Sequence, residues 1–306
     1  MSGLLTGEVR RLVARRMVKV LVLLAGLGIG LAGVLTFLNT EKSDIAAVQA
    51  RRQQVQREFQ NCFDRLSTGP RPGKPPRVVE ERGGACDVDT SGTDDKRLPL
   101  VDLSDILQGF TAPLVIVAWV LGASAIGADW QSRTLTTLLT WEPRRVRVLL
   151  GKAGAAMIVA ALFFLFAQAL LFGALLPSAL AHGTTAGADG SWYATLAGVV
   201  GRGGVMVAVA AGIGFAIASV GRNTAAALGI GFAYVVVIEN VVGQFLEDWR
   251  RWLLLGNTIV FVSGESGGGN EGVAGRSVLG AGIFLVAVSV GLLLAAAAVF
   301  RRRDVA

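Results

Sequence analysis

Six apolar stretches, each close to the length of a membrane-spanning helix, dominate this sequence. They cover residues 20–38, 106–128, 153–176, 203–220, 224–243 and 277–300. Roughly 20 consecutive apolar residues are needed to cross the hydrocarbon core of a bilayer as an α-helix. A helix in lipid is apolar all round, whereas a helix of a soluble domain carries a single apolar stripe. We therefore predict an all-α integral membrane protein with six transmembrane helices, and the 53% hydrophobic content agrees with this fold class.

The distribution of Lys and Arg predicts which ends of these helices face the cytoplasm. Residues 1–19, 129–152 and 301–306 are rich in Lys and Arg, whereas residues 177–193 contain neither. Because short cytoplasmic loops carry an excess of these residues, we place both termini and the 129–152 connection in the cytoplasm. The net charge is +7. The basic residues stand mainly beside apolar runs, where cations contact lipid headgroups. This pattern predicts membrane lipid, and no nucleic acid, as a partner.

The segment 39–105 is predicted to form an enlarged extracellular insertion between the first two spans. It is long and nearly neutral, and long segments largely escape the charge rule. Residues 44–63 lack Gly and Pro and predict a helix, either separate or continuing the first span, before the Gly- and Pro-rich stretch 69–76 breaks regular structure. Outside the cell, Cys62 and Cys86 would form a disulfide; two free thiols are the alternative.

Three outer or terminal segments remain, and two of them leave an alternative open. The basic residues 1–19 are predicted to form an amphipathic interfacial helix before an uncleaved first span, rather than a signal peptide, since the apolar run is long and no A-x-A site follows directly. The third span is predicted to end at Pro177, and residues 177–202 are predicted to form an extracellular loop. In segment 244–276, residues 245–255 predict an interfacial helix followed by a flexible loop. Trp249 and Trp252 would anchor that helix at the headgroups or pack against the sixth span.

No motif for catalysis stands in this chain, and we predict that it is not an enzyme. Residues 28–33 match G-x-G-x-x-G, but they lie inside a spanning run and not between a strand and a helix. Within that run, Gly26 and Gly30 form a small-xxx-small pair that favours helix contact. There is no phosphate-binding loop. The single histidine, His182, and the two cysteines have no metal-ligand spacing, so no metal site is expected.

The most informative stretch is residues 127–152, GADWQSRTLTTLLTWEPRRVRVLLGK, between the second and third spans. Leu135, Leu138 and Leu139 would share one face of a short helix lying along the membrane. Pro143 ends that turn, and the basic residues that follow it precede the third span. This short cytoplasmic helix would either dock a soluble partner or lie at the interface with snorkelling arginines and no partner.

This stretch resembles the signature of type-2 ATP-binding-cassette (ABC) transporter permeases. In that family an acidic residue, a Gly-Thr step, a Leu-Leu pair, a Pro, an Arg and a Lys lead into the third helix. The matching positions here are Asp129, Thr134, Leu138, Leu139, Pro143, Arg145 and Lys152. Two positions depart from the pattern, since Asp129 replaces the more frequent Glu and Arg133 stands where Gly is common. The resemblance spans nearly the whole chain except residues 39–105, which exceed the family's usual first outer loop.

The resemblance implies a function and a set of partners. Two permease chains, here expected to be a homodimer, would bind two separate ABC ATPase subunits, and ATP with Mg would be held by those subunits with no cofactor in this chain. The segment from Asp129 through Pro143, Arg144 and Arg145 would couple ATP-driven movement to the spans. Residues 4–18 would form the connecting helix. The family mostly exports, and apolar helix surfaces suit a lipid-like or hydrophobic drug-like cargo.

Three polar residues stand in or near the apolar runs. Arg202 and Glu239 would pair with each other, line an exit path, or lie at the outer interface. Gln168, in the third span, is expected to make a helix–helix hydrogen bond.

Two other function classes remain open on sequence alone. The chain could be a membrane scaffold or sensor that acts through its extracellular 39–105 segment. It could also be an ion-coupled transporter, although no internal repeat is evident and few charges lie at depth. The Ala-, Gly-, Val- and Arg-rich composition suggests a high-GC bacterium and therefore a bacterial cell membrane.

Overall fold

The computed structural model describes residues 2–41, 44–68, 96–132, 134, 144–242, 245, 247–265 and 275–302. Within these residues the chain is helical, and it contains no β-strand. Six helices of the described chain are long and apolar enough to cross a membrane, as the sequence predicts. They comprise α2 (Arg16–Asn39), η2 and α4 (Leu100–Asp102 and Leu103–Gln131), α6 (Arg145–His182), α7 (Gly190–Gly221), α8 with η3 (Thr224–Ala233 and Tyr234–Val242) and α11 (Val278–Arg302).

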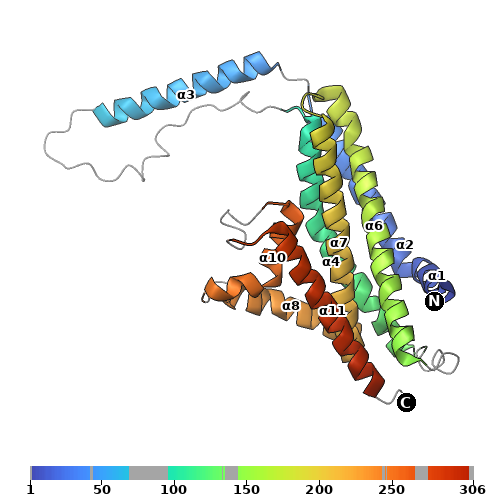
Figure 1. The fold of residues 1–306 in the computed structure, drawn as a ribbon. Coiled ribbons are helices and arrows are strands. Elements are labelled where there is room, and N and C mark those ends of the chain that lie inside the picture. The colour runs from blue at the N-terminus through green and yellow to red at the C-terminus, as the bar shows by residue number, and fades with distance from the viewer. Residues whose placement is uncertain are drawn as a thin grey trace.

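Four further helices accompany these spans. They are α1 (Ser2–Val13), α3 (Ile45–Thr68), the 3₁₀ helix η4 (Glu247–Trp252) and the short apolar helix α10 (Leu254–Ser263). Figure 1 shows both termini towards the end of the bundle where α4 ends and α6 begins, and α3 at the opposite end. We call these the inner and outer ends, following the sidedness predicted from Lys and Arg.

The helices α4 and α7 form the centre of the bundle through glycines on both partners. A Cβ atom at Gly122 of α4 would overlap the Ala211 carbonyl of α7, and a Cβ at Gly214 of α7 would overlap the Trp119 carbonyl of α4. Small residues allow such close backbone approach, which is how helices associate in lipid, where apolar burial itself gives little driving force. Consequently 72% of the most apolar stretch of α7 is buried.

The helices α2 and α8 lie at the periphery. Only 11% of the most apolar stretch is buried in α2, and the same fraction in the fifth span. Figure 1 shows α8 leaving the bundle crosswise, while α2 runs along α6. These two spans therefore present most of their apolar side chains to lipid or to another chain.

The two ends of the outer insertion are joined to each other, and the second end is also joined to the bundle. The Glu41 N–H donates to the Lys96 carbonyl at 3.3 Å, the Lys96 ammonium pairs with the Glu41 carboxylate at 3.3 Å, and the Leu100 N–H donates to the Thr184 carbonyl at 2.9 Å. The predicted helix over 44–63 exists as α3, but it does not continue α2 directly, because α2 ends at Asn39 with Thr40 extended. It stands away from the bundle (Figure 1).

The third and fourth helices are longer than the spans predicted from hydropathy. The prediction that Pro177 ends the third helix is wrong, since α6 continues to His182 and buries Ser178 and Ala179 against its neighbours. The fourth helix begins at Gly190, not near Gly203, so the expected loop 177–202 shortens to residues 183–189.

The early start of α7 has a local cause at Asp189. Its carboxylate accepts the N–H groups of Ser191 at 3.0 Å and Trp192 at 3.1 Å, so it caps the helix. The hydrogen bond from the Ser191 hydroxyl and the one from the Trp192 N–H lower the pKa of Asp189.

The outer segment after the fifth span also differs from the sequence prediction. In place of one amphipathic helix over 245–255, the chain forms η4 and then the apolar helix α10. The Trp252 ring lies 5.9 Å from the Phe284 ring of α11, edge to face, although Trp252 remains 54% exposed. Trp252 thus contacts the sixth span.

The α4–α7 contact predicts that Gly122→Leu destabilises the fold. A leucine cannot fit against the Ala211 backbone, and overpacking of this kind costs about 1–3 kcal/mol. Thermal unfolding of the purified protein in detergent should show a lower Tm. Gly109→Leu, at another glycine of α4 where an added Cβ meets nothing within 4 Å, is the matched control, and equal Tm values for the two variants would contradict the α4–α7 packing.

Candidate functional site

Three charged side chains from different helices are buried together at the inner end of the bundle. Glu8 of α1, Asp129 near the end of α4, and Lys152 in the second turn of α6 retain 8%, 2% and 4% of their accessible surface. Charged residues are almost never this buried unless they are paired. Asp129 and Lys152 also flank the segment 133–143, so the two ends of that connection meet at this point.

The Lys152 ammonium is the centre of the cluster. Its Nζ donates to Glu8 Oε1 and Oε2, each at 2.9 Å, and to Asp129 Oδ2 at 2.7 Å. Charge-assisted hydrogen bonds of this length are the stronger class in proteins. Three donors on the ammonium therefore find three carboxylate oxygens, and α1, α4 and α6 are joined at one atom.

The second oxygen of Asp129 is bound by the link between α1 and α2. Arg15 Nη2 lies 2.8 Å from Asp129 Oδ1, and the same guanidinium donates to the carbonyls of Ser124 at 3.1 Å and Ala125 at 3.4 Å in α4. Arg11 Nη2 lies farther out, at 3.6 Å from Asp129 Oδ1, with its side chain 42% exposed. We name Glu8, Arg15, Asp129 and Lys152 the inner charge cluster.

The four residues of the inner charge cluster are together electrically neutral, with two carboxylates against one ammonium and one guanidinium, and the partly exposed Arg11 adds a positive charge at its edge. Desolvating these groups is costly, so the cluster is weak evidence for added stability. Its geometry has a clearer consequence, because loss of Lys152 leaves the Glu8 carboxylate buried and unpaired, and loss of Asp129 removes a partner from both Lys152 and Arg15. The amphipathic N-terminal helix is thereby held in one position relative to both ends of the 133–143 segment.

The structure describes some of the predicted coupling residues. The Thr134 hydroxyl donates to the Asp129 carbonyl at 3.4 Å, Arg144 is exposed just before α6, and Arg145 is the first residue of α6. Leu138, Leu139 and Pro143, and with them the predicted short helix along the membrane, lie outside the described residues.

Glu8 was not predicted as a member of this site. A signal was present, since Glu8 is the only acidic residue before Glu41 in an otherwise basic N-terminal segment. If such an acid is buried, it needs a cation as partner. Which cation it meets depends on how α1 packs, and this packing is not visible in the sequence.

Gln168 and Glu239, two of the predicted intramembrane polar residues, have separate hydrogen-bond partners. Gln168 Nε2 donates across helices to the Leu107 carbonyl at 3.0 Å and to the Thr111 hydroxyl at 3.3 Å. No ion pair joins Arg202 to Glu239 in the part of the chain that the structure describes. Arg202 lies within α7 and not in an outer loop, and Glu239 Oε1 accepts the Leu255 N–H at 2.8 Å.

The sequence candidates for a disulfide are Cys62 and Cys86. Cys62 is disulfide-bonded; Cys86 is outside the described residues, so the pairing of these two cysteines stays a prediction.

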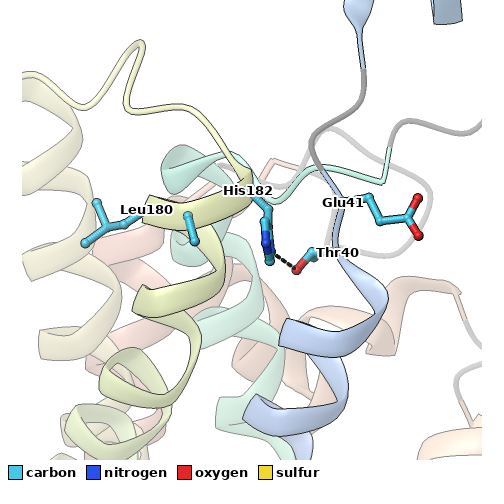
Figure 2. Close-up of a pocket in the computed structure, with 5 residues that line it drawn as sticks. Thr40, Glu41, Leu180 and His182 are labelled. Carbon is cyan, nitrogen blue, oxygen red and sulfur yellow. Dashed lines mark hydrogen bonds between the residues drawn. The ribbon is translucent and has the colours of Figure 1, made fainter.

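Figure 2 shows the outer depression formed by Thr40, Glu41, Leu180, Ala181 and His182. There the Thr40 hydroxyl and His182 Nδ1 lie 3.2 Å apart, so this contact ties the end of α2 to the end of α6.

Six candidate spans, of which α4 and α6 are joined to α1 by a buried charge cluster at the ends of the 133–143 segment, define a multi-pass membrane protein. A family model described as ABC-2 family transporter protein matches residues 4–305. The chain therefore belongs to this family, which confirms the resemblance seen in residues 127–152. A search among curated proteins finds no significant match. Membership makes the chain a permease subunit of an ABC transporter, a component that is not itself catalytic and that works with ABC ATPase subunits.

The inner charge cluster predicts a large effect of Lys152→Met. This change leaves Glu8 buried without a cation and removes one of the two close cations of Asp129, which keeps Arg15. Breaking a buried pair in this way costs about 3–5 kcal/mol. Detergent thermal unfolding should show a marked fall in Tm. Arg16→Met removes an exposed cation of the same region and should change stability by no more than about 0.5 kcal/mol. A Lys152→Met protein as stable as the Arg16→Met control would contradict the pairing.

Proposed function

We propose that this chain is the permease subunit of an ABC exporter for a lipid-like or hydrophobic drug-like cargo in a bacterial cell membrane. ATP hydrolysis on separate ATPase subunits drives it through the 129–152 connection. The inner charge cluster is the observation that carries the proposal. It joins both ends of that connection and the N-terminal helix, so that a force applied there reaches α1, α4 and α6 together.

The mechanism follows from the mechanical role of the inner charge cluster. Closure of the ATPase subunits on ATP would push the 133–143 segment. Because Lys152 binds carboxylates of both α1 and α4, α6 cannot move at its inner end without carrying these helices. The helices α1, α4 and α6 then move together, and the path between two permease chains changes shape.

The apolar interior supports an apolar cargo. The buried core of the described spans is formed mostly by Ala, Leu, Val, Ile and Phe. Among its few polar residues, the Gln168 amide donates to the Thr111 hydroxyl of a neighbouring helix. A strongly charged cargo would need compensating charges along its path. Lipid-like or hydrophobic drug-like molecules need none.

A homodimer is supported by the exposed small-residue pair on α2. An added Cβ at Gly26 or Gly30 would meet nothing within 4 Å, so the close approach that these glycines allow is not used within one chain. Gly33 of the same helix, in contrast, packs against Ala174 of α6. A helix of a second copy would fit against the unused pair.

Association with the ATPase subunits tests the coupling proposal. We expect Leu138→Asp and Arg145→Glu to reduce co-purification of co-expressed candidate ATPase subunits at least about tenfold, since docking residues at the centre of an interface are worth about 2 kcal/mol or more. Arg57→Glu, the same charge change on α3, is the control and should leave association unchanged. If neither variant weakens binding, the coupling proposal is wrong, and deletion of residues 44–95 then tests the scaffold alternative.

Cysteine cross-linking tests the homodimer. Gly26→Cys and Gly30→Cys lie on one face of α2, whereas Leu24→Cys and Leu31→Cys lie on the opposite, exposed face. Mild oxidation in membranes should give a reducible dimer band for the two glycine positions and little for the two leucine positions. Equal cross-linking on both faces, or none at the glycine positions, would contradict pairing through Gly26 and Gly30.

A further inference from the structure

The outer helix α3 carries an apolar stripe along most of its length. Its larger apolar residues recur at spacings of three, four and seven positions. At 3.6 residues per turn, this spacing places them within an arc of about 100° on one side of the helix. They are Ile45, Val48, Val55, Phe59, Cys62 and Phe63. A stripe of this width is typical of a helix that lays one face on a broad apolar surface, and it is wider than the seam of a two-stranded coiled coil.

One edge of this stripe is half-buried, and the other edge is exposed. Val48 and Val55 belong to the half-buried edge. On the other edge, Ile45, Phe59 and Phe63 keep 45%, 46% and 43% of their accessible surface. Figure 1 shows α3 away from the helices of the bundle. Within the residues that the structure describes, the exposed edge therefore has no helix packed over it.

A cation stands within the exposed edge. Arg52 lies seven residues after Ile45 and seven before Phe59, so the three residues project from nearly the same side of α3, and Arg52 is exposed. We call Ile45, Arg52, Phe59 and Phe63 the open edge. An arginine among apolar residues suits the boundary of a bilayer, because its stem can lie along the acyl region while its guanidinium reaches the headgroup phosphates.

The same cation argues against a second copy of α3 as the occupant of the open edge. Two copies packed in parallel through this edge would bring their Arg52 guanidiniums together inside an apolar seam. A charge at a central position of such a seam lowers the stability of the pair, and burying a charge without a counterion is costly. A lipid surface imposes no such cost, since its phosphates supply the counterion.

The position of α3 relative to the spans is the one that an interfacial helix needs. The first span, α2, is apolar up to Leu38, and α3 begins a few residues later at Ile45. Figure 1 shows α3 at the outer end of the bundle, running crosswise to the long axis of the spans. Because the spans cross the bilayer, a helix perpendicular to them at this level lies along the plane of the outer leaflet.

The charge of α3 favours an anionic surface. The helix contains four arginines against two carboxylates, namely Arg51, Arg52, Arg57 and Arg65 against Glu58 and Asp64. Basic residues close to anionic phospholipid are attracted to it, and this attraction falls off within the Debye length. Charge complementarity therefore selects anionic over zwitterionic lipid for the surface that the open edge meets.

We propose that α3 is an interfacial helix that binds the outer leaflet through its open edge. Ile45, Phe59 and Phe63 lie among the acyl chains, and Arg52 binds the phosphate of an anionic phospholipid. This contact holds the outer insertion against the membrane beside the bundle. The inference goes beyond the proposed transport function and does not depend on it.

Photo-cross-linking tests which face of α3 meets lipid. The full chain is reconstituted in phosphatidylcholine vesicles that contain phosphatidylglycerol, with p-benzoylphenylalanine in place of one residue at a time. Phe59 and Phe63 represent the open edge, and the exposed Gln54 and Asn61 represent the opposite face. We expect about tenfold more phospholipid adduct at the two phenylalanine positions, measured by mass spectrometry of α3 peptides, because only one face of an interfacial helix reaches the acyl chains.

Three results would overturn the proposal. The first is equal lipid adduct on both faces, and the second is no lipid adduct at Phe59 and Phe63. The third is a covalent dimer from these two positions without lipid adduct, since this would show that a second copy covers the open edge. All four variants should keep the Tm of the parent protein, because α3 stands away from the bundle, and this reports that they fold.

A charge variant tests the anionic phospholipid. Arg52→Gln, combined with p-benzoylphenylalanine at Phe59, should lower the lipid adduct up to about fivefold in vesicles with phosphatidylglycerol, as about 1 kcal/mol per arginine near an anionic surface implies. In vesicles of phosphatidylcholine alone the change should be small. Arg57→Gln removes the same charge outside the apolar stripe and is the control. Equal adduct from Arg52→Gln and Arg57→Gln in the anionic vesicles would overturn the binding of phosphate by Arg52.

Discussion

Lipid offers no hydrogen-bond partner to a polypeptide, and most features of this protein follow from that constraint. Each backbone N–H and C=O group at membrane depth must be satisfied within the protein, which explains why the described chain is helical. Where the helices break, other elements supply the partners. Tyr234 and Glu239 cap α10, and Asp189 caps α7 at the outer surface. Glycines at the α4–α7 contact then allow the close packing that replaces the hydrophobic effect between helices.

The same constraint gives charged side chains a strong influence on geometry. At the inner end, Lys152 binds Glu8 and Asp129, and Arg15 binds Asp129 and two carbonyls of α4. On the outer side, Glu239 accepts the Leu255 N–H at the start of α10. Since an uncompensated charge in a medium of low dielectric constant costs several kcal/mol, both arrangements hold helices in defined positions.

Sequence patterns predicted part of these arrangements. The number of spans and the class of protein follow from hydropathy and from the resemblance of residues 127–152. That resemblance named Asp129 and Lys152 as motif positions, but not as an ion pair. The boundaries of the third and fourth helices were harder to predict from the sequence. The third helix continues beyond Pro177 and buries Ser178, and this extension is stabilised by packing against neighbouring helices rather than by the local sequence. Glu8 was missed for a similar reason, since its cation is supplied by a residue more than a hundred positions away.

The sequence by itself determined that this chain lies in a membrane, roughly where it crosses, and which family it resembles, because apolar length and a local motif are properties of contiguous residues. Only the tertiary structure decided which charges meet. Arg202 and Glu239 appeared in the sequence as a candidate pair, yet α10 lies between them, and Glu8 appeared as one acid in a basic helix, yet it binds Lys152. Pairing depends on the packing of elements that are distant in the chain, and the periodicity of a single helix carries no information about that packing.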